Sequence, residues 1–313
     1  MTTGLITHPA CLDHAVPSGH PERPQRLNAV LGVLEAEGPQ DLIHMEASRA
    51  TRDSLLRAHE EALVDAVLSA RIAEGQFLRV DADTAMSAGS AEAALRAAGA
   101  VTAAVDAVMS GRIGNAFCAV RPPGHHAERA RSMGFCLFNN IAVGALHARA
   151  IYGLKRVAVV DFDVHHGNGT QDIFYRDADL FYASTHQFPL YPGTGSSAER
   201  GIAGNIINAP LAPGAGSAEF RSTSGNLILP ALERFSPQFI FISAGFDAHR
   251  SDPLAALRLD ESDFAWATEQ ICAVAGRVCS GRVVSVLEGG YDLDALARSA
   301  AAHVTAMIAS SES

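Results

Sequence analysis

Short apolar runs alternate with longer amphipathic stretches along most of the chain. Each short run is almost free of polar residues and ends at a polar cluster, which is typical of strands buried on both faces of a parallel sheet. The longer stretches carry apolar residues three and four positions apart, the period of a helix with one buried face. This alternation predicts an α/β fold: a mostly parallel β-sheet flanked by helices, with an active site at the carboxyl ends of the strands.

The pattern gives each element an approximate place. The predicted strands are residues 4–7, 116–120, 156–160, 180–183, 239–243 and 282–287. The predicted helices are residues 24–37, 91–110, 139–152, 219–234, 262–280 and 293–309. Two segments rich in Gly, Pro and Ser, residues 121–135 and 187–218, are predicted to be loops, and loops of that length are usually functional. No linker divides the sequence, so we expect residues 1–313 to form a single domain.

The composition narrows the class of protein. With 48% hydrophobic and 19% charged residues the chain can bury a large core, and its net charge of −10 opposes binding to nucleic acid or to an anionic membrane. No apolar stretch approaches the roughly 20 residues of a membrane span, and the first residues lack the pattern of a signal peptide, so we expect a cytoplasmic protein. The five cysteines, an odd number without a C-x-x-C pair, are expected to be buried free thiols, Cys136 among them. The oligomeric state stays open.

Residues able to do chemistry follow almost every predicted strand, and in a parallel sheet these positions meet at one edge. A single histidine in such a place is more often a loop residue satisfied by the backbone, but chance does not explain polar residues at so many strand ends. The sequence therefore predicts one site built from distant segments. Its candidates, in chain order, are His125, His126, Asp161, Asp163, His165, His166, Thr185, His186, Asp247 and Tyr291.

Three of these residues form a candidate metal site. Asp163 and His165 stand two apart, so in an extended segment their side chains point the same way. With Asp247 they give three ligands that leave a position open for water, as catalytic zinc requires, and the thiolate-free set also suits ferrous iron. For Asp163 the alternative is a helix N-cap, which the glycines of HHGNG make less favourable. Asp83, in DADTAMS, is expected to cap a helix rather than to orient substrate.

The remaining candidates suit proton transfer and charge stabilisation. His125 and His126 are candidates for acid–base work, because imidazole titrates closest to neutral pH. Asp161 alternates away from Asp163 and is expected to hold a histidine ring from behind, which would fix the tautomer of that ring. Tyr291, on a Gly-Gly turn, can donate a phenolic hydrogen bond to a developing oxyanion. A tyrosine after a strand is by itself more often a packing residue.

The motifs that hold these residues resemble the histone deacetylase superfamily, which also contains acetylpolyamine amidohydrolases and acetoin-utilisation proteins. In order along nearly the whole chain they are HPERPQR, RPPGHH, GFCLFNN, VDFDVHHGNGTQ, STHQFPLYPGTG, SAGFDAH and LEGGYD. The pattern is that of the bacterial and class II branch, in which Asn168 stands where other members carry Asp. By position, the resemblance implies that His126 is the general base and acid, that His125 is an electrostatic partner held by Asp161, and that Tyr291 is the catalytic tyrosine. It also implies that Asp163, His165 and Asp247 bind zinc.

The same resemblance implies a substrate tunnel and a second ion. Phe135 and Tyr191 would sandwich the aliphatic stem of the substrate, the Gly134 carbonyl would accept the hydrogen bond of the scissile amide, and Arg23 would line a channel behind the metal. Leu254 falls where polyamine-selective members carry an acidic residue, which counts against a strict polyamine enzyme. A structural potassium site would be built from the main chain of three residues and one side chain: Asp161, Asp163, His165 and Ser184.

The main functional hypothesis is zinc-dependent hydrolysis of an N-acyl amide, most simply Nε-acetyl-lysine. Three alternatives stay open: a small-molecule amidase or esterase, which includes the acetylpolyamine amidohydrolases; an arginase-like ureohydrolase with two manganese ions; and a catalytically silent acyl-lysine binder. The sequence contains no G-x-S-x-G elbow, no H-E-x-x-H helix and no phosphate-binding G-x-x-x-x-G-K-[ST] loop, so other common hydrolytic chemistries have little support.

Overall fold

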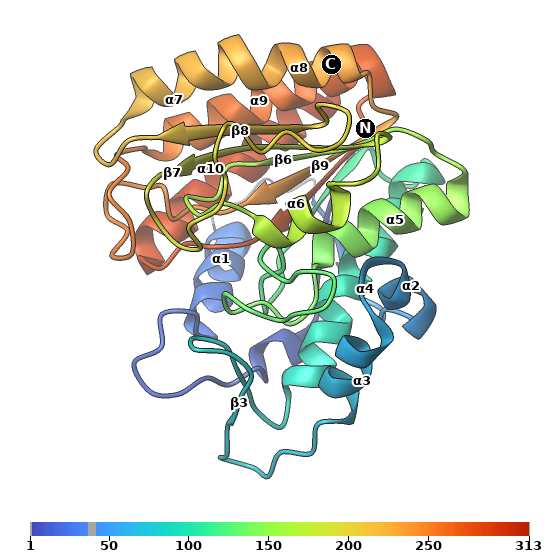
Figure 1. The fold of residues 1–313 in the computed structure, drawn as a ribbon, viewed down its shortest axis with the longest axis vertical. Coiled ribbons are helices and arrows are strands. Elements are labelled where there is room, and N and C mark those ends of the chain that lie inside the picture. The colour runs from blue at the N-terminus through green and yellow to red at the C-terminus, as the bar shows by residue number, and fades with distance from the viewer. Residues whose placement is uncertain (1, 37–41, 313) are drawn as a thin grey trace.

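Eight parallel strands form the main sheet of the computed structural model, which describes residues 2–36 and 42–312 (Figure 1). Their order is β2-β1-β5-β10-β9-β6-β7-β8. The strands are β1 (Thr3–Thr7), β2 (Leu42–Glu46), β5 (Asn115–Cys118), β6 (Val157–Asp161), β7 (Leu180–Gln187), β8 (Ile206–Leu211), β9 (Phe239–Ala244) and β10 (Val283–Leu287). The six predicted strands are all in this sheet, which confirms the predicted fold class.

Helices cover both faces of the sheet (Figure 1). On one side α4 packs against α5, on the other α9 packs against α10, and both pairs also contact the central strands. The helices are α1 (Gln25–Ala36), α2 (Arg52–Ala58), α3 (Glu61–Ser69), α4 (Ser90–Met109), α5 (Asn140–Tyr152), α6 (Asn168–Phe174), α7 (Ser217–Thr223), α8 (Leu229–Phe235), α9 (Glu261–Cys279) and α10 (Leu293–Glu312). A short 3-10 helix spans Pro9–Leu12.

Each of the six predicted helices is present, with two differences in detail. The helix predicted at residues 219–234 is divided into α7, a π-helical turn over Ser224–Ile228, and α8. Pro230 explains the change, because it lacks the amide hydrogen that a regular helix would use at that position. The helix predicted at residues 24–37 ends at Ala36, and Glu37 lies outside the described residues.

Two edge strands were not predicted. β2 is half-exposed, so it lacks the continuous apolar run by which the buried strands were recognised. β8 lies within residues 187–218, which were predicted to be a loop, and this part of the prediction is wrong. β8 contains Pro210, and proline has no amide hydrogen to donate to a neighbouring strand. Sheets accept such a residue in an edge strand, because one side of that strand has no neighbour.

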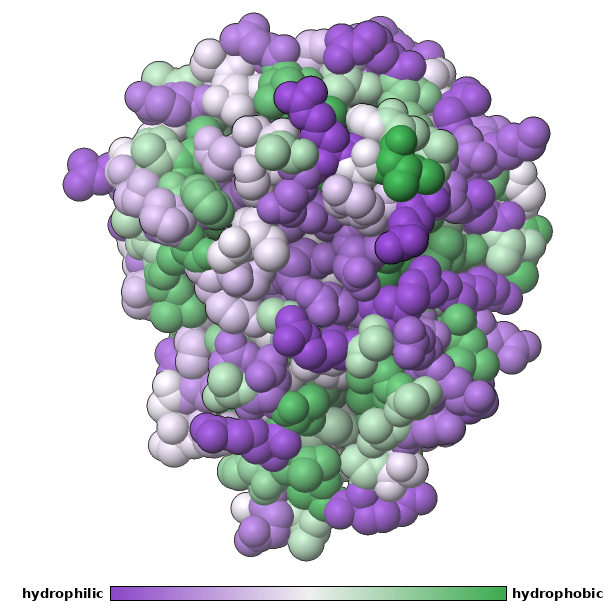
Figure 2. Space-filling model, viewed as in Figure 1, coloured by the Kyte–Doolittle hydropathy of each residue, from purple (hydrophilic) through white to green (hydrophobic). Residues whose placement is uncertain are grey.

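A small antiparallel hairpin projects beside the main sheet. It pairs β3 (Leu78–Arg79) with β4 (Ala85–Met86). Figure 2 shows apolar side chains at the lower end of the molecule, where β3 lies in Figure 1, and Phe77 and Leu78 are 43% and 47% exposed. The turn of this hairpin reaches the loop that follows β5, because the hydroxyl of Thr84 accepts a hydrogen bond from the Phe135 amide.

All five cysteines are buried and free, as the sequence predicted. Over residues 2–36 and 42–312, none of the helices combines the length and the apolar composition that a membrane span requires.

Candidate active site

Five neighbouring strands of the sheet, β5, β10, β9, β6 and β7, lead into the candidate residues. All five run in the same direction, so their carboxyl ends share one edge. The histidine doublet follows β5, Tyr291 follows β10, Asp247 follows β9, and Asp163 with His165 follows β6. The fold therefore brings together segments that lie up to half the sequence apart.

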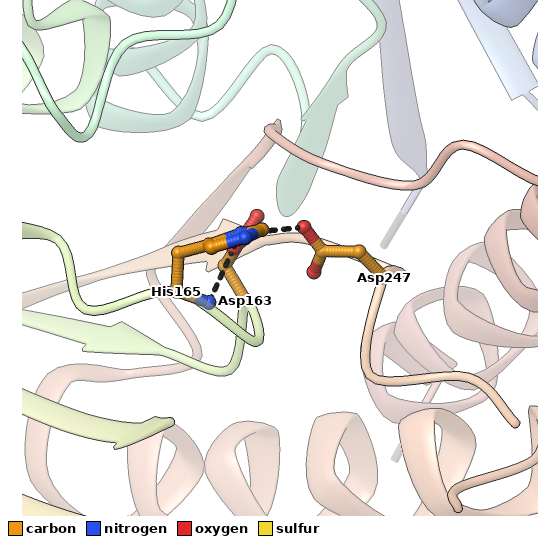
Figure 3. Close-up of side chains that lie close together, drawn as sticks. All are labelled: Asp163, His165 and Asp247. Carbon is orange, nitrogen blue, oxygen red and sulfur yellow. Dashed lines mark hydrogen bonds and ion pairs between the residues drawn. The ribbon is translucent and has the colours of Figure 1, made fainter. Parts of the chain in front are cut away.

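Asp163, His165 and Asp247 converge at the centre of this edge (Figure 3). Nδ1 of His165 lies 3.1 Å from Oδ1 of Asp163 and 3.0 Å from Oδ2 of Asp247. The three possible ligand atoms lie within 4.8 Å of one another, and all three residues are buried. Asp163 and His165 come from the segment after β6 and Asp247 from the segment after β9, so this set of donors exists only in the folded chain.

Two glycines make room for the carboxylates. A Cβ atom on Gly245 would lie 2.0 Å from Oδ2 of Asp163, and one on Gly289 would lie 2.1 Å from Oδ2 of Asp247. The amide of Gly289 also donates a hydrogen bond of 2.8 Å to Asp163. Any larger residue at either position would displace a carboxylate, so these glycines of SAGFD and LEGG serve close packing against the site.

The three donors fit a divalent cation. Ligands bound to a tetrahedral zinc ion at about 2.0–2.2 Å lie roughly 3.3 Å apart, which is close to the two separations measured from His165. Burial and the charge of Asp163 raise the pKa of Asp247. Two adjacent buried carboxylates are costly unless a positive charge lies between them, and a cation held by this set would supply it.

His125 is backed by a carboxylate. Its Nδ1 atom lies 3.0 Å from Oδ2 of Asp161, which also accepts a hydrogen bond from the Tyr182 hydroxyl. Its Nε2 atom is 3.8 Å from Oδ1 of Asp163. Burial would lower the pKa of His125, but the charges of Asp163 and Asp161 outweigh it and raise the pKa to about 10. The ring is therefore an imidazolium in this arrangement.

His126 is backed by an amide instead. Its Nδ1 atom lies 2.8 Å from Oδ1 of Asn168, the first residue of α6. Burial lowers the pKa of His126, and the positive charges of His125 and His165 lower it further, well below its usual value. The neighbouring rings of the doublet, 4.0 Å apart between centroids, are thus held in different charge states, His125 cationic and His126 neutral, by different partners.

α6 starts where the sequence argued against a helix. The glycines of HHGNG were expected to oppose an immediate helix start, but α6 begins at Asn168 with Gly167 as its N-cap. Gly167 is required for packing, since a Cβ atom there would lie 2.4 Å from Oδ2 of Asp161. Asp163 is not the N-cap of this helix.

Tyr291 stands between an arginine and the tunnel candidates. The guanidinium of Arg26 lies over its ring at 4.9 Å from the centroid, and the Phe135 ring packs edge-on at 6.0 Å. Burial raises the pKa of Tyr291 well above its usual value, an effect that the charge of Arg26 opposes only in part. The phenol is therefore protonated and can donate a hydrogen bond.

The arginine behind the site is Arg26, so the expectation for Arg23 is wrong. Arg23 is exposed, whereas Arg26 is fully buried and donates to the carbonyls of Gly290 and Glu288. The two arginines stand three residues apart in HPERPQR, a separation of about one helical turn. Helix α1 begins at Gln25, which points Arg26 inward and leaves Arg23 outside.

Two of the tunnel candidates, Tyr191 and Gly134, lie against His126. The Tyr191 ring packs edge-on against His126 at 5.1 Å and remains 37% exposed. A Cβ atom on Gly134 would lie 2.5 Å from the His126 ring, so glycine lets this loop approach the histidine closely. Leu254 is 37% exposed, and its amide donates to Oδ1 of Asp252.

Asp83 is not a helix cap, contrary to expectation. Helix α4 begins at Ser90, after Gly89. The side chain of Asp83 accepts a hydrogen bond from the Thr84 hydroxyl, and its carbonyl oxygen lies 3.1 Å from Nε2 of His20. This places Asp83 in the hairpin turn beside the site.

The residues proposed for potassium are adjacent. Asp161 on β6 is paired in register with Ser184 on β7. Oδ1 of Asp161 accepts a hydrogen bond from the Asp163 amide, and the Ser184 hydroxyl lies 2.9 Å from Nδ1 of His186. His166, the second histidine of its own doublet, points away from the metal-site candidates and pairs with Thr194 and Gln171.

Sequence reasoning missed two acidic residues that organise the site. Glu288 accepts hydrogen bonds from the amides of Gly124 and His125 and so fixes the histidine loop; burial raises its pKa to about 7. Asp252 binds the amides of Tyr291 and Leu254, one to each oxygen. Both follow strands of the sheet, and a carboxylate directly after an apolar run is the signal that could have identified Glu288.

Comparison with known proteins identifies the family. A model described as "Histone deacetylase domain" matches residues 20–307. The chain belongs to the histone deacetylase family. Members of this family are generally metal-dependent hydrolases of the deacetylase and amidohydrolase type, in agreement with the buried donor set.

Individual histone deacetylase relatives resemble most of the chain. It is 44% identical to a probable deacetylase of Methanothermobacter thermautotrophicus over 94% of its own length and 88% of the relative's. The chain is 37% identical to the type-2 histone deacetylase 2 of Dictyostelium discoideum over 98% of its length, but it spans only 21% of that protein. The crystal structure of the HDA15 HD domain superposes with a TM-score of 0.92 at 37% identity, covering 98% of this chain and 88% of that one.

Proposed function

We propose that the protein hydrolyses N-acyl amides, most simply Nε-acetyl-lysine, to the free amine and a carboxylate. The observation that carries this proposal is the buried donor set of Asp163, His165 and Asp247 beside two imidazoles with different partners. Paired groups whose environments separate their charge states are the arrangement that acid–base hydrolysis requires.

The three donors would hold one divalent cation, zinc first and ferrous iron as the other metal that suits them. When bound, such a cation polarises the acyl carbonyl and lowers the pKa of a water molecule. Within residues 2–36 and 42–312 this is the single group of His, Cys, Asp and Glu side chains arranged to hold a metal ion. That supports a mononuclear hydrolase over an arginase-like enzyme with two manganese ions.

His126 acts as the general base and acid. Its Nδ1 atom is occupied by Asn168, which leaves Nε2 to take a proton from the attacking water and to return it to the amine nitrogen as the C–N bond breaks. His125, kept charged by Asp161 and Asp163, provides positive charge beside the reacting group. The neutral ring is therefore the proton carrier and the charged ring the electrostatic partner.

Tyr291 stabilises the oxyanion. Its protonated phenol donates to the carbonyl oxygen as negative charge develops there. Hydrogen bonds from Arg26 to the Gly290 carbonyl and from the Tyr291 amide to Asp252 fix the backbone on both sides of the residue. A silent binder would not need a proton donor held in this way.

The substrate stem passes between Phe135 and Tyr191, and the Gly134 carbonyl accepts the hydrogen bond of the scissile amide. Leu254 offers an apolar surface to the substrate, which favours acetyl-lysine over acetylated polyamines. A potassium ion held by main-chain oxygens of Asp161, Asp163 and His165 with the Ser184 hydroxyl would stiffen the segment that carries the metal ligands.

The test is hydrolysis of a fluorogenic acetyl-lysine peptide by the purified protein before and after chelation, with zinc or ferrous iron restored at one ion per chain. We expect turnover that disappears with the chelator and returns with one metal. Comparison of kcat/KM with acetylputrescine separates the alternatives. A large preference for the diamine would establish the small-molecule amidase instead, and activity that requires two ions per chain would favour the ureohydrolase.

A further inference from the structure

Asn168 can support His126 as a base in only one of its two orientations. A carboxamide carries an acceptor oxygen on one side and a donor nitrogen on the other. If the oxygen faces His126, the ring must carry its proton on Nδ1, and Nε2 is free to accept one. If the amide is reversed, its nitrogen donates to Nδ1, the ring proton moves to Nε2, and the base is lost.

The groups around the far side of the amide decide between these orientations. Nδ2 of Asn168 lies 2.7 Å from Oε1 of Glu128, 3.3 Å from Sδ of Met133 and 3.4 Å from the main-chain oxygen of His126. All three are acceptors only, and the carboxylate is the nearest and the only charged one. A reversed amide would direct its oxygen at a carboxylate, so Glu128 selects the productive orientation.

Glu128 is itself held in place. Its main-chain amide donates to the Arg131 carbonyl, its carbonyl oxygen lies 3.0 Å from Nδ1 of the buried His59, and Oε2 lies 3.4 Å from Nε of Arg131. The side chain is 29% exposed, and its Oε1 atom points at the amide of Asn168.

A second set of residues in the same chain shows the same arrangement. Nε2 of His166 lies 3.0 Å from Oε1 of Gln171, and Nε2 of Gln171 donates to Glu199 over 2.6 Å. His125, by contrast, is backed by Asp161 directly. The two oxygens of a carboxylate are both acceptors, so its orientation does not change what it offers to the ring. A neutral amide keeps negative charge away from the ring of His126 but needs a group behind it that fixes its direction.

We propose that Glu128 is a positioning residue that orients the Asn168 amide and thereby sets the tautomer of His126. The inference rests on the proposed function, since the free Nε2 atom matters because His126 is the base. The Glu128 carboxylate contacts Asn168 and Arg131, so its path to His126 runs through the Asn168 amide.

The kinetic test is a series at position 128 in the metal-loaded protein. We expect kcat to fall in the order Glu, Gln, Ala, Lys, because these side chains offer an obligate acceptor, a group that can do either, no group, and an obligate donor. The loss is roughly three- to tenfold for Glu128→Ala and larger for Glu128→Lys, with KM nearly unchanged. Glu128→Gln has the same shape as the native residue, so it also covers the case in which the larger changes fail to fold.

A double-mutant cycle separates orientation from general disruption. In an Asn168→Asp background the group behind His126 has two equivalent oxygens, so Glu128→Ala should no longer lower kcat. The matched control is Asp172→Ala, which removes an exposed carboxylate of α6 that holds the same loop through the Arg129 amide. We expect that variant to keep its kcat, and an equal loss there would show that loop tethering, not amide orientation, is the cause.

Nitrogen NMR of histidine-labelled protein reads the tautomer without turnover. We expect His126, assigned with His126→Gln, to change from the Nδ1–H to the Nε2–H form in Glu128→Lys, while His166 is unchanged. An unchanged tautomer and unchanged kcat across the series would overturn the proposal. If the wild-type protein proves inactive, the proposed function fails, yet the NMR experiment still decides whether Glu128 orients the amide.

Discussion

Substitution of Glu22 by Gln should destabilise the protein, because Glu22 carries the negative charge of a buried ion cluster. Glu22, Arg26 and Arg121 are all fully buried. Nη2 of Arg121 lies 2.7 Å from Oε2 of Glu22, and Nη1 of Arg26 lies 3.0 Å from Oε1. Glu22→Gln keeps the shape of the side chain but leaves two buried guanidiniums without their counter-charge. Since Arg26 also binds the carbonyl before Tyr291, the cluster connects the first loop of the chain to the site.

Two independent arguments give a similar magnitude. Removal of one partner from a buried ion pair destabilises a protein by about 3–5 kcal/mol. Burial alone would raise the pKa of Glu22, but the charges of Arg121 and Arg26 lower it from 4.5 to about 2. That difference is worth roughly 3.4 kcal/mol at neutral pH. We therefore expect Glu22→Gln to reduce the free energy of unfolding by about 3–4 kcal/mol at pH 7.

The pH dependence distinguishes charge from packing. Because the folded-state pKa is below the unfolded one, the stabilisation is complete above pH 4.5 and is lost as the pH falls toward 2. At pH 3.5 the gap between wild type and Glu22→Gln should therefore be smaller by roughly 1.4 kcal/mol. Urea denaturation followed by circular dichroism measures both values. A gap that stays constant with pH would mean that packing, not charge, causes the loss.

The matched control is Glu61→Gln. Glu61 pairs with Arg52 at 2.7 Å, but its side chain is 72% exposed, so water replaces the lost interaction. We expect no measurable change in its urea midpoint. A loss as large as that of Glu22→Gln would refute the role assigned to burial.

Three further predictions follow from the site and its surroundings. Tyr291→Phe should lower kcat on an acetyl-lysine peptide roughly 100- to 1,000-fold, the effect of losing one oxyanion donor, and near-native turnover would remove the role assigned to the phenol. Zinc at 1,000 times its dissociation constant should stabilise the wild-type protein against urea by about 4 kcal/mol, and Asp247→Asn should lose most of that gain. Burial lowers the pKa of His59 from 6.5 to about 4, so as the pH falls the unfolded chain takes up a proton at this residue that the folded chain does not. Between pH 7 and pH 5 His59→Gln should therefore lose roughly 2 kcal/mol less stability than the wild-type protein, and an identical loss in both proteins would contradict this prediction.

The fold could be predicted wherever burial produces a recognisable pattern of apolar residues, either a continuous run in a strand or a three-and-four spacing in a helix. The central strands are apolar throughout because both of their faces are covered, and all six appear in the structure at nearly the predicted positions. β2 and β8 leave no such trace, because an edge strand is partly exposed and accepts polar residues and proline. The π-helical turn before Pro230 is a local response to one missing amide hydrogen, which the three-and-four spacing of apolar residues does not record.

The candidate site could be located from the sequence, but its supporting contacts could not. The carboxyl ends of neighbouring parallel strands lie at one edge of the sheet, so the sequence alone groups Asp163, His165 and Asp247. The choice between Arg23 and Arg26 depends on where one helix begins, and an error of a single turn reverses which of two arginines is buried. Glu22, Asp252 and Glu288 act on main-chain amides or on buried arginines, and residue type alone does not show what a carboxylate will bind.

The histidine doublet shows most clearly what sequence cannot provide. His125 and His126 are adjacent and chemically identical, and their assignment as partner and base rests on what lies behind each ring. Asp161 reaches one ring from the end of β6, and Asn168 reaches the other from the start of α6, with Glu128 behind it. A carboxylate places negative charge beside a ring, whereas an amide is neutral and acts through whichever of its two ends, oxygen or nitrogen, faces the ring. Which end faces the ring depends on a third residue from another loop. The chemical difference between two identical side chains is therefore a tertiary property, set by contacts among three segments whose spacing in the sequence carries no sign of it.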